Sequence, residues 1–334
     1  MECSRLNVGQ IPLDECVEVV ASIYSPHDRH RSIWDVWCHT LHHAAGVAEQ
    51  IRKGAPREDL HREIADFSLW LFTTILKLVG NFGEPQGSSE APHDKFIRIQ
   101  STCSDLLWHK YPKSCPACYA PKIVSANTNA SELGHLSPCE CQARRPKAED
   151  PAARSERIAA LKDYSAMICA EKPKGIDEWQ KMFGMVFEAN LMVLAPSEIV
   201  LRLMEELGEV SDAMIRMYTY SEKNFVNGEP NRRQLNLEGE IADAFSWLFA
   251  LVEKLDSLKQ KTHENGKQGS EPTTAHTASV RLSGIIWDRY GSDALNSFCC
   301  WKCKARECRC QIILVPATRP TEELMQKFHE FREA

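Results

Sequence analysis

Apolar residues recur at spacings of three and four along most of this chain, and runs in which apolar and polar residues alternate are nearly absent. Such spacing predicts amphipathic helices, whereas alternation would predict strands. In the segment 197–217, one face of a helix carries only large apolar side chains: Val200, Leu203, Leu207, Val210, Met214 and Met217. The pattern therefore predicts an all-α fold built from helical bundles.

A long internal repeat divides the chain. The sequence EIADFSLWLF at 63–72 returns as EIADAFSWLF at 240–249, and LLWHKYP at 106–112 returns as IIWDRYG at 285–291. A cysteine-rich stretch follows each copy. Self-similarity over such a length indicates that one structural unit occurs twice. We therefore expect two tandem helical bundles arranged as a pseudo-dimer, each followed by a small zinc knuckle.

Two acidic pairs lie at equivalent places on neighbouring predicted helices of the second unit. At about 100° per residue, Glu206 falls at the edge of the apolar face of 197–217, and Glu209 lies about 60° beyond it. Glu240 and Asp243 take the same positions on the next helix. If the two apolar faces pack together, the four carboxylates meet at one rim, where a cation must offset their repulsion. Oxygen ligands alone favour Mg²⁺ or Mn²⁺ over zinc.

Each acidic pair also has a simpler interpretation as the solvated face of its helix. The combination of EELGEV at 205–210 with EIAD at 240–243, however, resembles the ExxE and ExxD motifs of the MazG-like, all-α nucleoside triphosphate pyrophosphohydrolases. The similarity spans most of 176–290 and includes the Arg–Tyr pair of IIWDRYG, although the Asn often found there in the family is missing. The resemblance implies that four residues hold the catalytic Mg²⁺ or Mn²⁺: Glu206, Glu209, Glu240 and Asp243.

The reaction that the resemblance implies is hydrolysis between the α and β phosphates of a nucleoside triphosphate, ribo or deoxy, giving the monophosphate and pyrophosphate. Glu205 is the candidate for orienting the attacking water or accepting its proton. Trp247, two turns after Glu240, is a candidate for stacking on the base, unless it belongs to the core. Arg281 and Arg289, near the end of the last helix, are the candidate contacts to the substrate.

The family unit suggests six segments along the chain. They are a degenerate MazG-like helical unit (1–112), a first zinc knuckle (113–142), a linker with a short helix (143–173), an intact MazG-like helical unit (174–292), a second zinc knuckle (293–315) and a C-terminal helix (316–334).

The first unit keeps only half of the acidic set. Glu63 and Asp66 preserve the second motif, but His43 and Gly46 replace the two glutamates of the first. Because half of the metal site is missing, we expect this copy not to catalyse. MazG-like enzymes commonly act as dimers in which one protomer completes the other's pocket, so this copy could serve as a scaffold or as one wall of the nucleotide pocket. In an alternative, His39, one helical turn before His43, joins these side chains around a different, softer metal.

Eight of the 14 cysteines form two similar clusters. Each has a CxxC pair followed by a CxC pair: Cys115, Cys118, Cys139 and Cys141 in the first, and Cys300, Cys303, Cys308 and Cys310 in the second. Four thiolates in two close pairs are typical of a structural zinc site, which predicts two Zn²⁺ per chain. Cys299 is an alternative to Cys300, His135 is an alternative to one thiolate of the first cluster, and disulfides are an alternative to metal.

Composition limits the partners. The net charge of −6 and pI near 6.1 argue against a protein that holds nucleic acid mainly through its overall charge, although local basic segments could still bind it. The second cysteine cluster, CWKCKARECRC at 300–310, is nevertheless basic and includes Trp301. It supports a rival hypothesis, in which the chain is a non-catalytic nucleotide sensor or a zinc-dependent nucleic-acid-binding regulatory protein.

The N-terminal sequence MECSRLNVGQIPLDE lacks the basic start and apolar core of a signal peptide, and no stretch reaches the ~18 uninterrupted apolar residues of a membrane span. We expect a cytoplasmic protein without membrane contact that binds a nucleotide, either as a single chain or as a homodimer.

Overall fold

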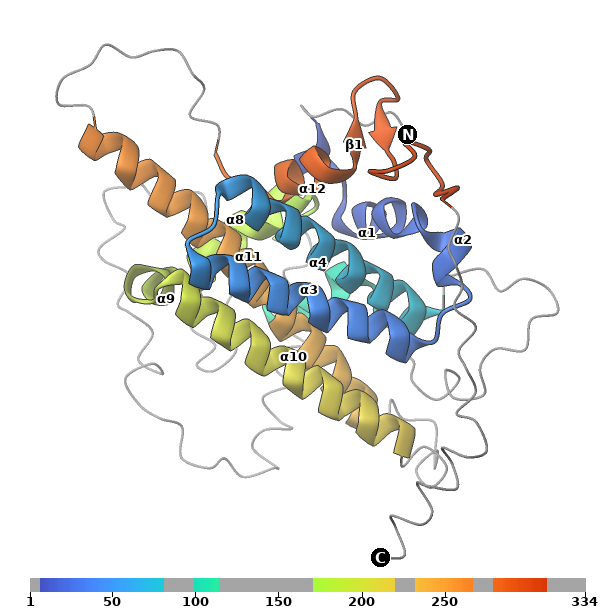
Figure 1. Cartoon of the computed structure of the whole chain (residues 1–334). Coiled ribbons are helices and arrows are strands. Elements are labelled where there is room, and N and C mark those ends of the chain that lie inside the picture. Colours follow the sequence, from blue (N-terminus) through green and yellow to red (C-terminus); the bar gives the residue numbers. More distant parts are fainter. Residues whose placement is uncertain (1–6, 81–98, 114–170, 220–231, 267–278, 311–334) are drawn as a thin grey trace, which may run out of the picture.

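The computed structural model describes residues 7–80, 99–113, 171–219, 232–266 and 279–310. Helices dominate these residues, which confirms the all-α prediction (Figure 1). The first part contains η1 (Val8–Gln10), α1 (Leu13–Ser22), α2 (Ser25–Asp28), α3 (Ile33–Lys53), α4 (Arg57–Val79) and α5 (Cys103–Lys110). The second contains α8 (Ile176–Val186), α9 (Glu188–Val193), α10 (Pro196–Thr219), α11 (Arg232–Gly266), α12 (Leu282–Tyr290) and an antiparallel hairpin of β1 (Gly291–Ser292) and β2 (Ser297–Phe298).

Three predicted features lie outside the described residues: the first cysteine cluster, the short helix of the linker and the C-terminal helix. In the described ranges, no helix combines the length and the apolar character that crossing a bilayer requires.

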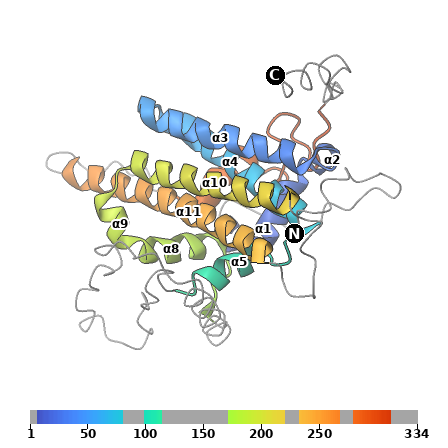
Figure 2. The same cartoon turned by 90° about the horizontal axis from the view of Figure 1, so that it is seen from below.

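Two long helical hairpins form the centre of the molecule. α3 packs along α4, α10 packs along α11, and α3 lies beside α10 (Figures 1 and 2). The apolar face predicted for 197–217 is buried throughout. Between the hairpins, the Trp37 indole N–H donates to Ser211 Oγ at 2.8 Å. The helical periodicity of the sequence therefore places the core correctly.

Local signals set the ends of α3 and α4. Ser32 caps α3 through a capping box with Asp35, which satisfies backbone N–H groups that have no partner within the helix. Gly54 caps the C-terminus of α3 and Gly80 that of α4, both with positive φ, a conformation that glycine adopts without steric cost. The three residues between the two helices make them antiparallel neighbours.

The short helix that follows each hairpin packs on the other hairpin. α5, which follows α4 in sequence, packs on α11, whereas α12, which follows α11, packs on α4. The segments before α1 and α8 also pair: the Leu13 N–H donates to the Lys174 carbonyl at 2.9 Å, and the Ile176 N–H donates to the Ile11 carbonyl at 3.3 Å. The two halves of the chain are therefore interlocked, and each supplies a short helix to the hairpin of the other.

Candidate functional site

Three carboxylates converge between α10 and α11. Glu206 on α10 and Glu240 and Asp243 on α11 each offer an oxygen, and these oxygens lie within 4.8 Å of one another. All three side chains are partly buried. Glu209, one turn after Glu206, is exposed but close enough to share a hydrogen bond with Glu240. The structure thus brings together three of the predicted metal-binding residues, with the fourth at the edge.

The cluster resists full ionisation. Burial, together with the carboxylates of Asp243 and Glu209, raises the pKa of Glu206 to about 8. Burial also raises the pKa of Glu240 to about 7, although the positive charge of Lys110 acts in the opposite direction. Negative charges held this close in a partly dehydrated place repel one another. A cation at this point would relieve the repulsion.

A lysine and a tyrosine from the other half of the chain contact the cluster. The Lys110 ammonium, at the end of α5, forms an ion pair with Asp243 and donates to the Gly239 carbonyl at 3.0 Å. The Tyr111 hydroxyl donates to the second oxygen of Asp243 and accepts a hydrogen bond from Ser246 at 3.2 Å. Burial, followed by the charge of Asp243, raises the pKa of Tyr111 well above its ordinary value. Tyr111 therefore remains a donor.

The donor set fits a hard divalent ion. Carboxylate oxygens are the ligands that Mg²⁺ and Mn²⁺ prefer, and one or two carboxylates plus substrate phosphates commonly complete a Mg²⁺ site. Lys110 balances one carboxylate, that of Asp243, and a cation that displaces the protons of Glu206 and Glu240 would meet two further negative charges. The residues present are therefore suited to Mg²⁺ or Mn²⁺.

Three other predicted site residues lie apart from the cluster. Glu205 is exposed and forms an ion pair with Arg202 at 2.7 Å. Trp247 stacks on Phe187, with ring centroids 4.8 Å apart, so its ring packs against the junction of α8 and α9. Arg281 contacts Glu253 at 3.5 Å. Glu253 follows Asp243 by ten residues, which is about 15 Å along a helix.

Arg289, another residue predicted to contact the substrate, lies instead beside Asp66, which belongs to the acidic pair of the first half. Its guanidinium forms two hydrogen bonds with the Asp66 carboxylate, at 2.9 and 3.1 Å, and the Tyr290 hydroxyl donates to the same group. This Arg–Tyr pair matches Lys110 and Tyr111 in the sequence repeat. The basic–tyrosine pair that follows each hairpin thus closes the acidic site of the other hairpin.

The other predicted residues of the first-half site form two separate pairs. His43 Nδ1 lies 3.1 Å from Glu63 Oε2, and the His39 ring stacks on Trp70 with centroids 4.2 Å apart. Gly46 leaves room for this pair, because a Cβ there would come within 2.5 Å of Glu63 Oε2. His43 therefore pairs with Glu63, but among the described residues no three of His39, His43, Glu63 and Asp66 lie close enough together to hold a metal ion.

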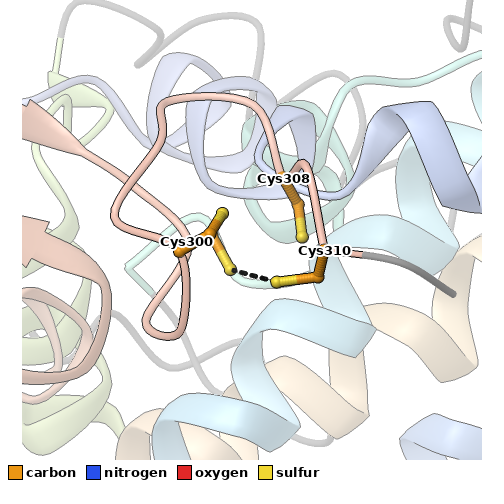
Figure 3. A group of neighbouring side chains, drawn as sticks. Cys300, Cys308 and Cys310 are labelled. Atoms are coloured by element: carbon orange, nitrogen blue, oxygen red, sulfur yellow. Dashed lines mark hydrogen bonds between the residues drawn. The ribbon is translucent and has the colours of Figure 1, made fainter.

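The second cysteine cluster is assembled. Sulfur atoms of Cys300, Cys303, Cys308 and Cys310 all lie within 4.8 Å of one another. Figure 3 shows three of them facing a common point, with Cys300 Sγ 3.9 Å from Cys310 Sγ. Thiolates at tetrahedral positions ~2.3 Å from a zinc ion would be ~3.8 Å apart, whereas a disulfide needs ~2.05 Å. All four are free cysteines, and the cluster can hold a metal such as zinc.

The backbone around this cluster is held in place. The Cys300 N–H donates to the Ala305 carbonyl at 2.8 Å, and the Cys308 N–H donates to the Ile23 carbonyl at 2.7 Å. The Tyr24 hydroxyl lies 3.6 Å from Cys300 Sγ. Contacts to Ile23 and Tyr24 attach the cluster to the segment between α1 and α2. Cys299 is buried outside the cluster, so Cys300 is the ligand candidate.

Sequence reasoning missed Lys110 and Tyr111 as neighbours of the acidic cluster. The signal was present, because LLWHKYP matches IIWDRYG, but the repeat does not reveal which hairpin each pair contacts. No family model matches the chain, and no curated protein or solved structure matches it either.

Proposed function

We propose that this chain hydrolyses nucleoside triphosphates to the monophosphate and pyrophosphate with a divalent cation held by Glu206, Glu240 and Asp243. Glu209 lies at the edge of the same site. The observation that supports the proposal most is the convergence of these carboxylates from two helices, with oxygens within 4.8 Å. Three acidic groups are costly to hold so close unless a cation or phosphate-bound metal balances them.

The cation would neutralise phosphate oxygens and lower the pKa of an attacking water. Water then attacks the α phosphorus, the bond to the bridging oxygen breaks, and pyrophosphate leaves. Glu209 is exposed beside Glu240 and is better situated than Glu205 to orient this water and accept its proton, because Glu205 is engaged with Arg202. Lys110 supplies a positive charge next to the site, where the triphosphate would enter.

The two halves have diverged from one MazG-like unit in this account. The second half carries the reactive cluster, whereas the first half contributes Lys110 and Tyr111 and holds its own acidic residues in internal pairs. Each half ends in a structural Zn²⁺ knuckle, which gives two zinc ions per chain. Support for the divergence comes from the order of the helices: two short helices, two long ones and a short one occur in α1 to α5 and again in α8 to α12, although α11 is longer than α4.

Pyrophosphate release from a panel of ribo- and deoxynucleoside triphosphates in the presence of Mg²⁺ tests the proposal. Glu240→Gln, which keeps the shape and removes the charge, should abolish release, and the matched Glu63→Gln should retain it. A protein that binds a nucleotide and releases no pyrophosphate from any member of the panel would instead be a sensor, the rival function.

A further inference from the structure

The second cysteine cluster presents an unusual surface for an acidic chain. Residues 301–310 contain four basic side chains and one acidic side chain, within a protein of net charge −6. The four basic residues are all exposed: Lys302, Lys304, Arg306 and Arg309. A zinc ion with four thiolates carries a net charge of −2, so the segment retains a net positive charge even with metal bound.

These cations are available to a ligand. Among the described residues, no acidic side chain lies within ion-pair distance of Lys302, Lys304 or Arg309. Arg306 donates to the Leu295 carbonyl at 3.2 Å, which fixes its position without neutralising it. Two of the thiol groups, those of Cys300 and Cys308, are buried. Positive charge therefore lies on the outer side of the cluster.

An exposed tryptophan adjoins these cations. Trp301 is 45% exposed, although burial of its large apolar ring would be favourable. The Arg289 guanidinium lies 4.4 Å from the centre of its ring, and Arg289 is itself held by Asp66. The indole is thus oriented from the protein side, while much of its surface remains open to solvent. Such a ring is suited to stacking on a planar ligand.

The loop that carries these groups is preorganised. Backbone hydrogen bonds join Cys300 and Ala305, at 2.8 Å, and Lys304 and Cys300, at 2.9 Å. Metal binding by the four cysteines would restrain it further. Little conformational freedom would be lost when a ligand binds, which favours affinity.

We propose that residues 301–310 form a binding surface for single-stranded nucleic acid. Trp301 stacks on one base, and Lys302, Lys304 and Arg309 contact phosphates along the strand. An aromatic ring beside unpaired cations fits a single strand better than a duplex, whose base faces are covered by stacking. The proposal is independent of nucleotide hydrolysis, since it concerns a surface formed by other residues.

Fluorescence anisotropy with the full zinc-loaded chain and a labelled single strand of about 12 nucleotides tests this surface. Mg²⁺ is left out so that turnover plays no part. Trp301→Ala should weaken binding about tenfold and leave its salt dependence unchanged, because a stacking contact carries no charge. Lys302→Gln combined with Lys304→Gln should reduce the slope of log affinity against log salt by about 1.4, from about 0.7 for each lost phosphate contact.

A matched double variant, Lys53→Gln with Lys181→Gln, removes two exposed lysines from α3 and α8 and should bind as the unaltered chain does. Zinc content and thermal unfolding establish that each variant is folded. The proposal is overturned if the unaltered chain does not bind the strand at low salt. It is also overturned if folded, zinc-loaded Trp301→Ala binds as tightly as the unaltered chain, or if duplex or polyglutamate competes as well as the single strand.

Discussion

The Lys110 ammonium at the end of α5 forms an ion pair with Asp243 on α11, 133 residues further along the chain. Arg289 makes the corresponding contact in the opposite direction, with Asp66 on α4. These two exchanged contacts join the halves of the protein at their acidic sites. The integrity of one half therefore affects the charge balance in the other.

Replacing Lys110 by methionine should destabilise the protein in the absence of Mg²⁺. Asp243 would lose a charged partner while only 16% of its side chain is exposed. Tyr111 would remain as a donor to Asp243, and losing a hydrogen bond to a charged group costs about 1.5–3 kcal/mol. We expect urea unfolding at neutral pH to show a decrease of this size, part of which Mg²⁺ should restore. Lys53→Met, which removes an exposed ion pair within α3, should leave stability unchanged. Equal losses in the two variants would contradict this account.

Stability without Mg²⁺ should fall as pH rises. The pKa of Glu206 is raised to about 8 and that of Glu240 to about 7. In the unfolded chain a glutamate ionises near pH ~4.3, so the unfolded state loses its protons first and is favoured as pH rises. The loss should develop between about pH 5 and pH 8 and then level off.

Urea unfolding of protein with zinc retained, with and without Mg²⁺, measures this effect. Mg²⁺ should stabilise the protein more at pH 8 than at pH 6, because it competes with protons for the carboxylates. Glu206→Gln should make the pH dependence shallower, since one of the two shifted carboxyls of this cluster is gone. A profile that Glu206→Gln leaves unchanged would show that this carboxyl does not titrate as described.

Two helical glycines should respond oppositely to alanine. A Cβ at Gly46 would press on the Glu63 carboxylate that pairs with His43, whereas nothing lies within 4 Å of a Cβ at Gly208. Alanine in an open helix position gains up to about 1 kcal/mol over glycine, but a forced contact costs about 1–3 kcal/mol. Chemical denaturation should therefore find Gly208→Ala more stable than the original protein and Gly46→Ala less stable. The reverse order would refute the proposed close contact.

Metal analysis should find about two zinc ions per chain in protein purified without chelators, one for each four-cysteine cluster. Cys303→Ser should lower the content to about one and lower the unfolding temperature, because the loop that contacts Ile23 and Tyr24 would lose its metal. Cys38→Ser, at an exposed free cysteine of α3, is the control and should change neither value. Zinc-free protein of unchanged stability would contradict the metal assignment.

Helical periodicity made the acidic cluster predictable, since the apolar face of α10 fixes where Glu206 points and the same spacing in α11 fixes Glu240 and Asp243. These are local relationships along one helix. Trp247 occupies the expected helical position, but its contact with Phe187 depends on how the junction of α8 and α9 packs on α11, which the pattern along α11 alone does not contain.

The sequence also could not predict that α5 packs on the hairpin of the second half and α12 on that of the first. Lys110 and Arg289 occupy equivalent places in the repeat, so the sequence is the same whether each pair closes its own hairpin or the other one. The choice between Cys299 and Cys300 depended on tertiary structure too. The Cys299 N–H extends the pairing of β1 and β2 by donating to the Tyr290 carbonyl, and neighbouring side chains in an extended strand point in opposite directions.

Binding of Mn²⁺, followed by the paramagnetic resonance signal of the free ion, tests most directly whether the acidic cluster holds a cation. The unaltered, zinc-loaded chain should bind Mn²⁺, and Glu206→Gln should weaken that binding by at least about tenfold, since a charged ligand is lost. Glu63→Gln, which removes a carboxylate from the acidic pair of the first half, should bind Mn²⁺ as the unaltered chain does. Equal Mn²⁺ affinity in the unaltered chain and in Glu206→Gln would contradict the account.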